Sequence, residues 1–403
     1  MNTYKTSEIV RFLIASFLGF LAGHLTNYSV ILYAQDVWNS DLLAGIGFSL
    51  CFGVPLFMGW FAGAWCDSYS PTRLAQLAHG SFLIALSLLT TSIHLPDTSG
   101  KLLFLGGGFF AGMGCAVLAP ARMALLGRIA GNKQAKLAVI FNILVMLGFG
   151  AAPPLLAFCK KINSWTLVHQ VGIGLFIIAI ILLIGLRVEG FGKSSSAIDR
   201  IKVGFRYVKS KALLFHIIIL SIIIYLSMGP VQVMLPRFAT QVLHLDEIGR
   251  GFFLGAIAVA LLIGGGISLP LTKKIPYGRL IFIMGAFTGI GKIGIGFSTN
   301  IYVSVLFLVI SGIGAGAGIS LIVAILQSES KEEYRGRLVS LYTITSQVIP
   351  ASSGLLSGII LTKLEVSKAL SIAGGLICFF LIIAFFKLHA IKIYNPHNKK
   401  EST

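Results

Sequence analysis

Acidic residues are scarce in this chain, which has 14 Asp and Glu residues against 32 Lys and Arg residues among 403 in total. Charged residues of both signs make up 11% of the sequence, whereas a soluble domain carries about 25%. Hydrophobic residues make up 56%, and one aqueous core cannot bury so large an apolar surface. We therefore expect lipid to be the solvent for most of the chain, which excludes an ordinary soluble protein.

Metal-binding cysteine patterns and catalytic motifs are also missing. The five cysteines show no metal-ligand spacing, and four of them fall in or beside apolar segments, so we interpret them as small hydrophobic residues. The sequence contains no nucleophile–base pair and no cofactor loop, and we therefore predict neither an enzyme nor a bound cofactor or metal. The glycine runs at 264–266 and 312–318 lack the Lys-Ser pair of a phosphate loop and favour close helix packing.

Apolar segments of spanning length, about 20 residues each, are what the chain has in abundance. We count 12 of them, six on each side of a polar stretch. The sequence thus predicts an all-α integral membrane protein with 12 transmembrane helices in two pseudo-symmetric six-helix bundles. A weak internal repeat supports two related halves: a shift of roughly 200 residues superposes Phe141 on Tyr342, and such repeats are typical of secondary transporters.

The polar stretch sets the domain boundaries. We place an N-terminal bundle at 1–186, a cytoplasmic linker at 187–213, a C-terminal bundle at 214–390 and a cytoplasmic tail at 391–403. From Ser196 the linker has the period of a short amphipathic helix with a strongly basic face. This pattern fits a helix that lies on an anionic membrane surface, and it also fits a solvated connector.

The distribution of basic residues predicts the orientation in the membrane. With the N-terminus in the cytoplasm, 24 of the 32 Lys and Arg residues fall on the cytoplasmic side and 7 on the outer side. Cytoplasmic loops carry an excess of Lys and Arg, so we expect both termini inside. The same bias explains the net charge of +18 by topology, and we predict no nucleic-acid partner.

Four stretches resemble a known family of membrane carriers. They read LAPARMALLGRI at 118–129, IKVGFRYVKSKALL at 201–214, VMLPRFATQVLHLDEIGRGFFLGAIAVALLIGGG at 233–266 and EEYRGRLVSLYT at 332–343. Together they are similar to the major facilitator superfamily, and within it to the enterobactin-exporter-like and macrolide-efflux-like branch. The resemblance implies alternating access in a bacterial inner membrane, and it supplies export as the direction of transport.

The sequence departs from the family's pattern at two positions that matter for coupling. In the signature between the second and third spans, Gly63 and Asp67 are kept, but Arg73 is the first basic residue that follows. The arginine that the family associates with proton coupling in the fourth span falls at Gly108. The resemblance therefore does not extend to drug–proton antiport.

Polar residues within spans are the candidates for contact with a substrate, because they are costly in lipid. His24 and Asn27 share a helix face at i and i+3, and His24 is the candidate for carrying a proton. The full set for the substrate cavity is His24, Asn27, Asn142, Tyr225, Gln232, Tyr342, Ser346 and Gln347. The alternative for each is a structural hydrogen bond between helices. We expect Lys292, in a peripheral span, to snorkel toward the outer interface.

Charged residues at the cytoplasmic ends of spans are candidates for a gate. Asp67 and Arg122 should lie at the ends of the second and fourth spans, where a pair would hold the inner side shut. The predicted gate comprises Asp67, Arg73 and Arg122 in the first half and Glu333, Arg335 and Arg337 in the second. The alternative is that these charges only set the topology.

These observations predict a secondary active transporter that exports a small molecule of the siderophore or drug-like class. A basic cavity favours an anionic substrate. Import or flipping of a metabolite or lysophospholipid is the alternative within transport, and a receptor or assembly protein on the same fold is the alternative outside it. We expect a small-molecule substrate, membrane lipid and a coupling proton as partners, and a monomer.

Overall fold

The computed structural model describes residues 6–392 except 96, 131–133, 187, 189–204 and 330–331, together with Tyr394. Twelve segments are long and apolar enough to cross a membrane, which confirms the predicted all-α fold. The helices of the first half are α1 (Thr6–Val37), α2 (Asp41–Ser68), α3 (Pro71–Ser92), α4 (Asp97–Ile129), α5 (Gln134–Asn163) and α6 (Trp165–Leu183). Those of the second half are α8 (Ala212–Tyr225), α9 (Met228–Gln241), α10 (Glu247–Leu271), α11 (Tyr277–Phe297), α12 (Ile301–Glu329), α13 (Glu332–Leu361), α14 (Val366–Lys387) and the short α15 (His389–Lys392).

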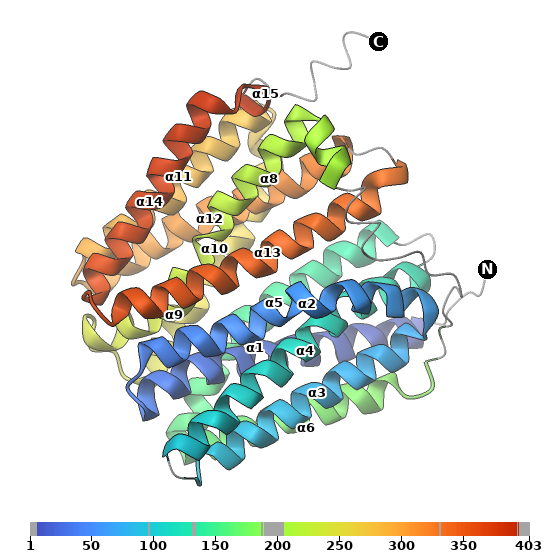
Figure 1. The fold of residues 1–403 in the computed structure, drawn as a ribbon, viewed down its shortest axis with the longest axis vertical. Coiled ribbons are helices and arrows are strands. Elements are labelled where there is room, and N and C mark those ends of the chain that lie inside the picture. The colour runs from blue at the N-terminus through green and yellow to red at the C-terminus, as the bar shows by residue number, and fades with distance from the viewer. Residues whose placement is uncertain are drawn as a thin grey trace. The chain divides into compact units, whose positions relative to one another are not determined.

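The chain divides into two compact units, each a helical bundle (Figure 1). Unit 1 comprises Met1–Ile198 together with Leu245–Gly255, and unit 2 comprises Asp199–His244 and Ala256–Thr403. The first residues of α10 thus belong to unit 1, whereas the remainder of this helix belongs to unit 2.

The same helix pairing recurs inside the two units. In unit 1, α3 packs against α4 and α6, and α1 packs against α5. In unit 2, α11 packs against α12 and α14, and α9 packs against α13. The third span (α3) and the ninth span (α11) therefore have equivalent neighbours. The same holds for the first span (α1) and the seventh span (α8 and α9), which agrees with the internal repeat read from the sequence.

Two glycines let α10 and α12 approach closely within unit 2. A Cβ atom on Gly264 would collide with the carbonyl of Ile313, and one on Gly316 would collide with the carbonyl of Leu261. Because glycine has no side chain, these two positions let the backbones of α10 and α12 come into contact. Close van der Waals packing of this kind stabilises helix association in lipid. The expectation that the glycine runs serve helix packing is confirmed.

The seventh span is kinked between α8 and α9. Pro230 has no N–H to donate to the carbonyl of Leu226, and its ring crowds that carbonyl. The Ser227 N–H instead bonds to the Ile224 carbonyl at 3.1 Å, one residue closer than in an α-helix. Pro236 lies inside α9 without ending it.

Within the linker, the structure describes Val188, which is buried, and the C-terminal end from residue 205 onward. Residues 205–210 are helical, with Val208 buried in the core of unit 2 while Arg206 and Lys209 are exposed. The remainder of the predicted amphipathic helix, at 196–204, lies outside the described residues.

Candidate functional site

A stripe of partly buried side chains runs along α1 in unit 1. Phe20, His24 and Asn27 follow at i, i+4 and i+7, so they share one face of the helix. The His24 ring is half-buried and meets the ring of Phe149 of α5 edge-on at 5.1 Å. Asn27 is buried, and its side-chain oxygen has no hydrogen-bond partner among the described residues.

Arg122 lies deep in unit 1, next to this stripe. It is 3% exposed, and its guanidinium lies 4.1 Å from the centre of the Phe20 ring. An Nη atom donates to Nε2 of the buried His79 of α3 at 3.2 Å. This contact joins residues 43 positions apart, so it is visible only in the folded bundle.

Two tyrosines meet in unit 2. The hydroxyls of Tyr225, at the end of α8, and Tyr342 of α13 are 2.7 Å apart. Ser346, one turn further along α13, is a second hydrogen-bond partner of Tyr225. The structure thus brings together three of the residues predicted for the cavity. Gln232 is buried in α9, and Gln347 is half-buried in α13.

Asn142 is the predicted cavity residue with the least protein around it. Its side chain is exposed on α5, whereas its neighbour Phe141 is buried against Phe12 and Phe20 of α1. The inward face of α5 at this level is therefore aromatic.

Most of the predicted gate cannot be compared with the structure. The side chains of Asp67, Glu333, Arg335 and Arg337 lie outside the described residues. Arg73 is exposed in the first turn of α3. The gate role of these residues, and the pairing of Asp67 with Arg122, stay predictions.

Lys292 does not snorkel, contrary to our expectation. It is 1% exposed, and its Nζ donates to Oγ of Ser311 in α12 at 3.0 Å. The Ser311 hydroxyl in turn donates to the Thr288 carbonyl at 3.0 Å. Because α12 and α14 pack on α11, this face of the helix is covered by protein, and the amine has no path along the helix to an interface.

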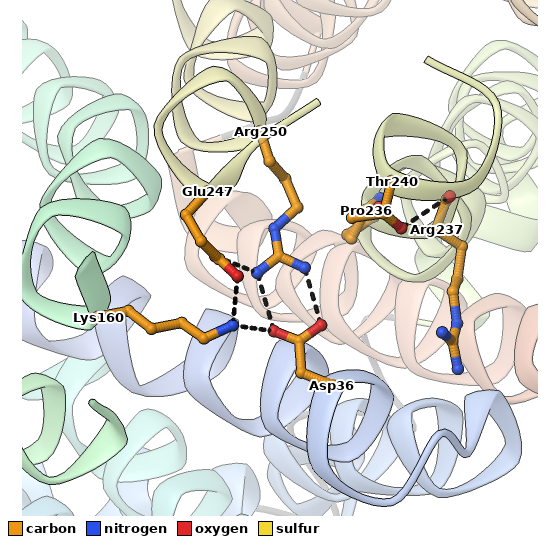
Figure 2. Close-up of polar contacts among 7 residues, drawn as sticks. All are labelled: Asp36, Lys160, Pro236, Arg237, Thr240, Glu247 and Arg250. Atoms are coloured by element: carbon orange, nitrogen blue, oxygen red, sulfur yellow. Dashed lines mark hydrogen bonds and ion pairs between the residues drawn. The ribbon is translucent and has the colours of Figure 1, made fainter. Parts of the chain in front are cut away.

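A ring of four charges joins three helix ends of unit 1 (Figure 2). Asp36, at the end of α1, accepts two hydrogen bonds of 2.8 Å from the guanidinium of Arg250 and one of 2.6 Å from Lys160 of α5. Glu247 closes the ring, because it accepts from Lys160 at 2.5 Å and from Arg250 at 2.6 Å. The two acids and two bases balance, and every charged group has two partners.

Burial strengthens this ring relative to ordinary surface ion pairs. The Arg250 side chain is 4% exposed, and those of Lys160 and Asp36 are 17% and 20% exposed. The bidentate contact between the Arg250 guanidinium and the Asp36 carboxylate is the strong geometry for such a pair. From the sequence, Lys160 and Arg250 are two of the seven basic residues predicted on the outer side, and their pairing with acids at neighbouring helix ends was not predicted.

Twelve membrane-crossing helices in two similarly paired bundles, with buried cations and ion-paired helix ends, define a membrane carrier. The chain belongs to the Major Facilitator Superfamily, whose family model matches residues 12–354 and also residues 270–402. It is thus a transporter of this superfamily, integral to a membrane, with a small molecule as its substrate.

Comparison with individual proteins agrees with the family. The chain is 24% identical over 376 residues to a protein named enterobactin exporter EntS from Escherichia coli O127:H6, covering 90% of this chain and 88% of the relative. The protein of the same name from Citrobacter koseri is 24% identical over 382 residues, covering 92% and 89%.

Solved transporters share the fold at low sequence identity. A POT family transporter in complex with a thioalcohol-conjugated peptide has a TM-score of 0.78 at 14% identity, covering 95% of this chain and 96% of the other. A bacterial homologue of the iron transporter ferroportin, in an inward-facing state, has a TM-score of 0.74 at 15% identity, covering 97% and 100%.

Proposed function

We propose that this protein exports a small anionic molecule, of the siderophore or drug-like class, across the bacterial inner membrane by alternating access. The ring of Asp36, Lys160, Glu247 and Arg250 is the observation that carries the proposal. Charge bias predicts that the end of α1, the end of α5 and the start of α10 all face outward. Three helix ends predicted on one side of the membrane are thus tied together by ion pairs on that side.

Such a ring has the properties of an outer gate. Its charges are mutually satisfied while the helix ends are together, and separating them exposes each charge to water. Because α10 continues from unit 1 into unit 2, release of its first turns from α1 and α5 would free a helix that both units share. Alternating access needs such a contact, which forms in one state and breaks in another.

Export as the direction is supported by the relatives, which are named enterobactin exporters. Import or flipping of a metabolite or lysophospholipid uses the same fold, so direction requires an experiment. An inside-negative membrane potential favours the exit of an anion by about 2.3 kcal/mol per charge at 100 mV. An anion exporter can therefore work without an intramembrane carboxylate that carries protons.

The proposal is tested in a bacterial strain that lacks the gene. Loss of the carrier should lower the extracellular iron-chelating activity of cells grown without iron, or sensitise the cells to drug-like anions, with the compound accumulating inside. Complementation with the wild-type gene should restore export. Complementation with the Asp36→Asn variant should restore much less, whereas Asp97→Asn, which alters an exposed ion pair on α4, should restore it fully. A strain that instead fails to take up an external metabolite would reverse the direction.

A further inference from the structure

Arg122 carries a buried positive charge that has no counterion among the described side chains. No carboxylate among the described side chains lies within ion-pair distance of its guanidinium, which contacts His79, the ring of Phe20 and the backbone at Gly19. Arginine stays protonated in proteins, so this charge cannot be removed by loss of a proton. A buried charge without a partner is strongly unfavourable, and an anion from outside the chain would remove that cost.

The described acids lie at helix ends, whereas Arg122 lies further inside its helix. Each Asp or Glu of the described chain lies in the first or last turn of a helix or just beyond its end. Arg122 lies about two turns before the end of α4, at Ile129. The described acids therefore supply no counterion to Arg122, and the acidic group of a ligand can take that role.

The backbone of α1 is shaped to accept this guanidinium. A Cβ atom on Gly19 would collide with an Nη atom of Arg122 and would lie 2.8 Å from Nε2 of His79. The absent side chain lets the guanidinium rest against the helix, beside the half-buried ring of Phe20. One turn further along α1, His24 is half-buried and interacts electrostatically with Arg122. Asn27 then presents its unpartnered amide oxygen on the same face.

His79 orients the guanidinium of Arg122, and its own protonation state depends on the charge of Arg122. Because arginine can only donate, Nε2 of His79 must accept, so the ring is neutral and carries its proton on Nδ1, which has no partner among the described residues. A second proton on this ring would place two cations 3.2 Å apart. Among the described residues, the other titratable groups that interact with Arg122 are His24 of α1 and Cys115 of α4, and the ring of Phe176 of α6 lies against His79. His79 can therefore gain a proton readily only when an anion has joined the pair.

We propose that Arg122, held by His79 and bordered by Phe20 and His24, is a binding site for a carboxylate or other oxyanion group of the transported molecule. The inference rests on the proposed function only in taking this anion to be the cargo. It assigns to Arg122 a role in binding in place of the predicted gate, and to His79 the role of a positioning residue. Proton binding at His79 and anion binding at Arg122 reinforce each other.

The test uses the purified full-length carrier in detergent and two probes of the same shape, benzoate and benzamide, with affinity measured by calorimetry. The wild type should bind benzoate at least tenfold more tightly than benzamide. Arg122→Gln should abolish this preference, and Arg122→Lys should keep part of it. The benzoate preference should grow from pH 8 to pH 6 in the wild type but not in His79→Gln.

Each outcome decides the proposal. Equal binding of the two probes by the wild type, or an unchanged preference in Arg122→Gln, would overturn the site. If Arg122→Gln does not fold, benzoate titration of the wild type in two buffers of different ionisation enthalpy remains, and zero proton uptake would refute the link to His79. Selective benzoate binding by a carrier that exports nothing would leave the site standing while the proposed export fails. Export by a carrier that binds benzoate and benzamide equally would leave the proposed export standing while the site fails.

Discussion

The ring of charges at the ends of α1, α5 and α10 allows a quantitative prediction for Asp36→Asn. The substitution keeps the shape of the side chain and removes its charge. Asp36 accepts three charge-assisted hydrogen bonds, two from Arg250 and one from Lys160. Asparagine has one acceptor oxygen, so at least one of these bonds is lost and the others become neutral at the acceptor. The ring also changes from electroneutral to a net charge of +1.

The expected magnitude follows from these losses. A hydrogen bond to a charged group contributes about 1.5–3 kcal/mol, and the Asp36 side chain is 20% exposed, which reduces the upper value. We therefore expect the closed ring to lose about 2–4 kcal/mol relative to an open arrangement. At about 1.4 kcal/mol per factor of ten, the open population should rise on the order of 30- to 1,000-fold.

A cysteine at position 157 reports this opening. Ala157 is buried on α5 and lies against Gly251 in the second turn of α10. In a chain whose five native cysteines are replaced by serine, the Ala157→Cys thiol should react slowly with a membrane-impermeant maleimide. Adding Asp36→Asn should accelerate labelling by the factor given above, because the thiol is reached when α10 leaves α5.

The matched control is Asp97→Asn at the start of α4, in the same unit. Its ion pair with Lys101 is exposed, with Asp97 at 68% and Lys101 at 40%, so its loss should cost less than about 1 kcal/mol and change labelling by less than fivefold. Equal labelling of the parent and the Asp36→Asn variant would refute the idea that the ring holds α10 against α5. Acceleration by both variants would show a loosened bundle without a specific latch.

Four further predictions concern topology, a buried amine and its partner, and the tyrosine pair. Reporter fusions after Lys211 and at the C-terminus should be cytoplasmic and one at Asp97 should be outside; an external C-terminus would contradict the charge-bias argument. Lys292→Met should melt no lower than the parent in purified form, because a buried amine whose partner is a neutral hydroxyl is costly and methionine replaces it by an apolar side chain. Ser311→Ala should lower the free energy of unfolding by about 1–3 kcal/mol, because it removes the acceptor of the amine. Tyr225→Phe should leave the melting temperature nearly unchanged, since hydrogen bonds between membrane helices average about 0.6 kcal/mol, while raising the KM for transport; an unchanged KM would make the pair structural.

The sequence predicted many residues of the candidate site, but it did not predict which side chains these residues contact. His24 and Asn27 were expected on one face because three residues advance nearly one helical turn, and this local geometry does not depend on other helices. The contact of Arg122 with His79 joins residues 43 positions apart, and no local pattern encodes which helix covers Arg122. Lys292 was wrongly expected to reach the interface because peripheral placement was inferred for its whole span, whereas its own face is covered by α12.

The sequence by itself determined the number of spans, the kink at Pro230 and the restriction of acids to helix ends. Each of these depends on properties of consecutive residues: apolar length against bilayer thickness, a missing N–H donor and the cost of charge in lipid. Tertiary structure alone decided that Asp36 meets Arg250, 214 residues away, and that Arg122 lies beside His79. Ion pairs and buried contacts act over a few ångströms, so they depend on how each helix is rotated against its neighbours. That rotation is set by packing between helices distant in sequence, and no single segment determines it.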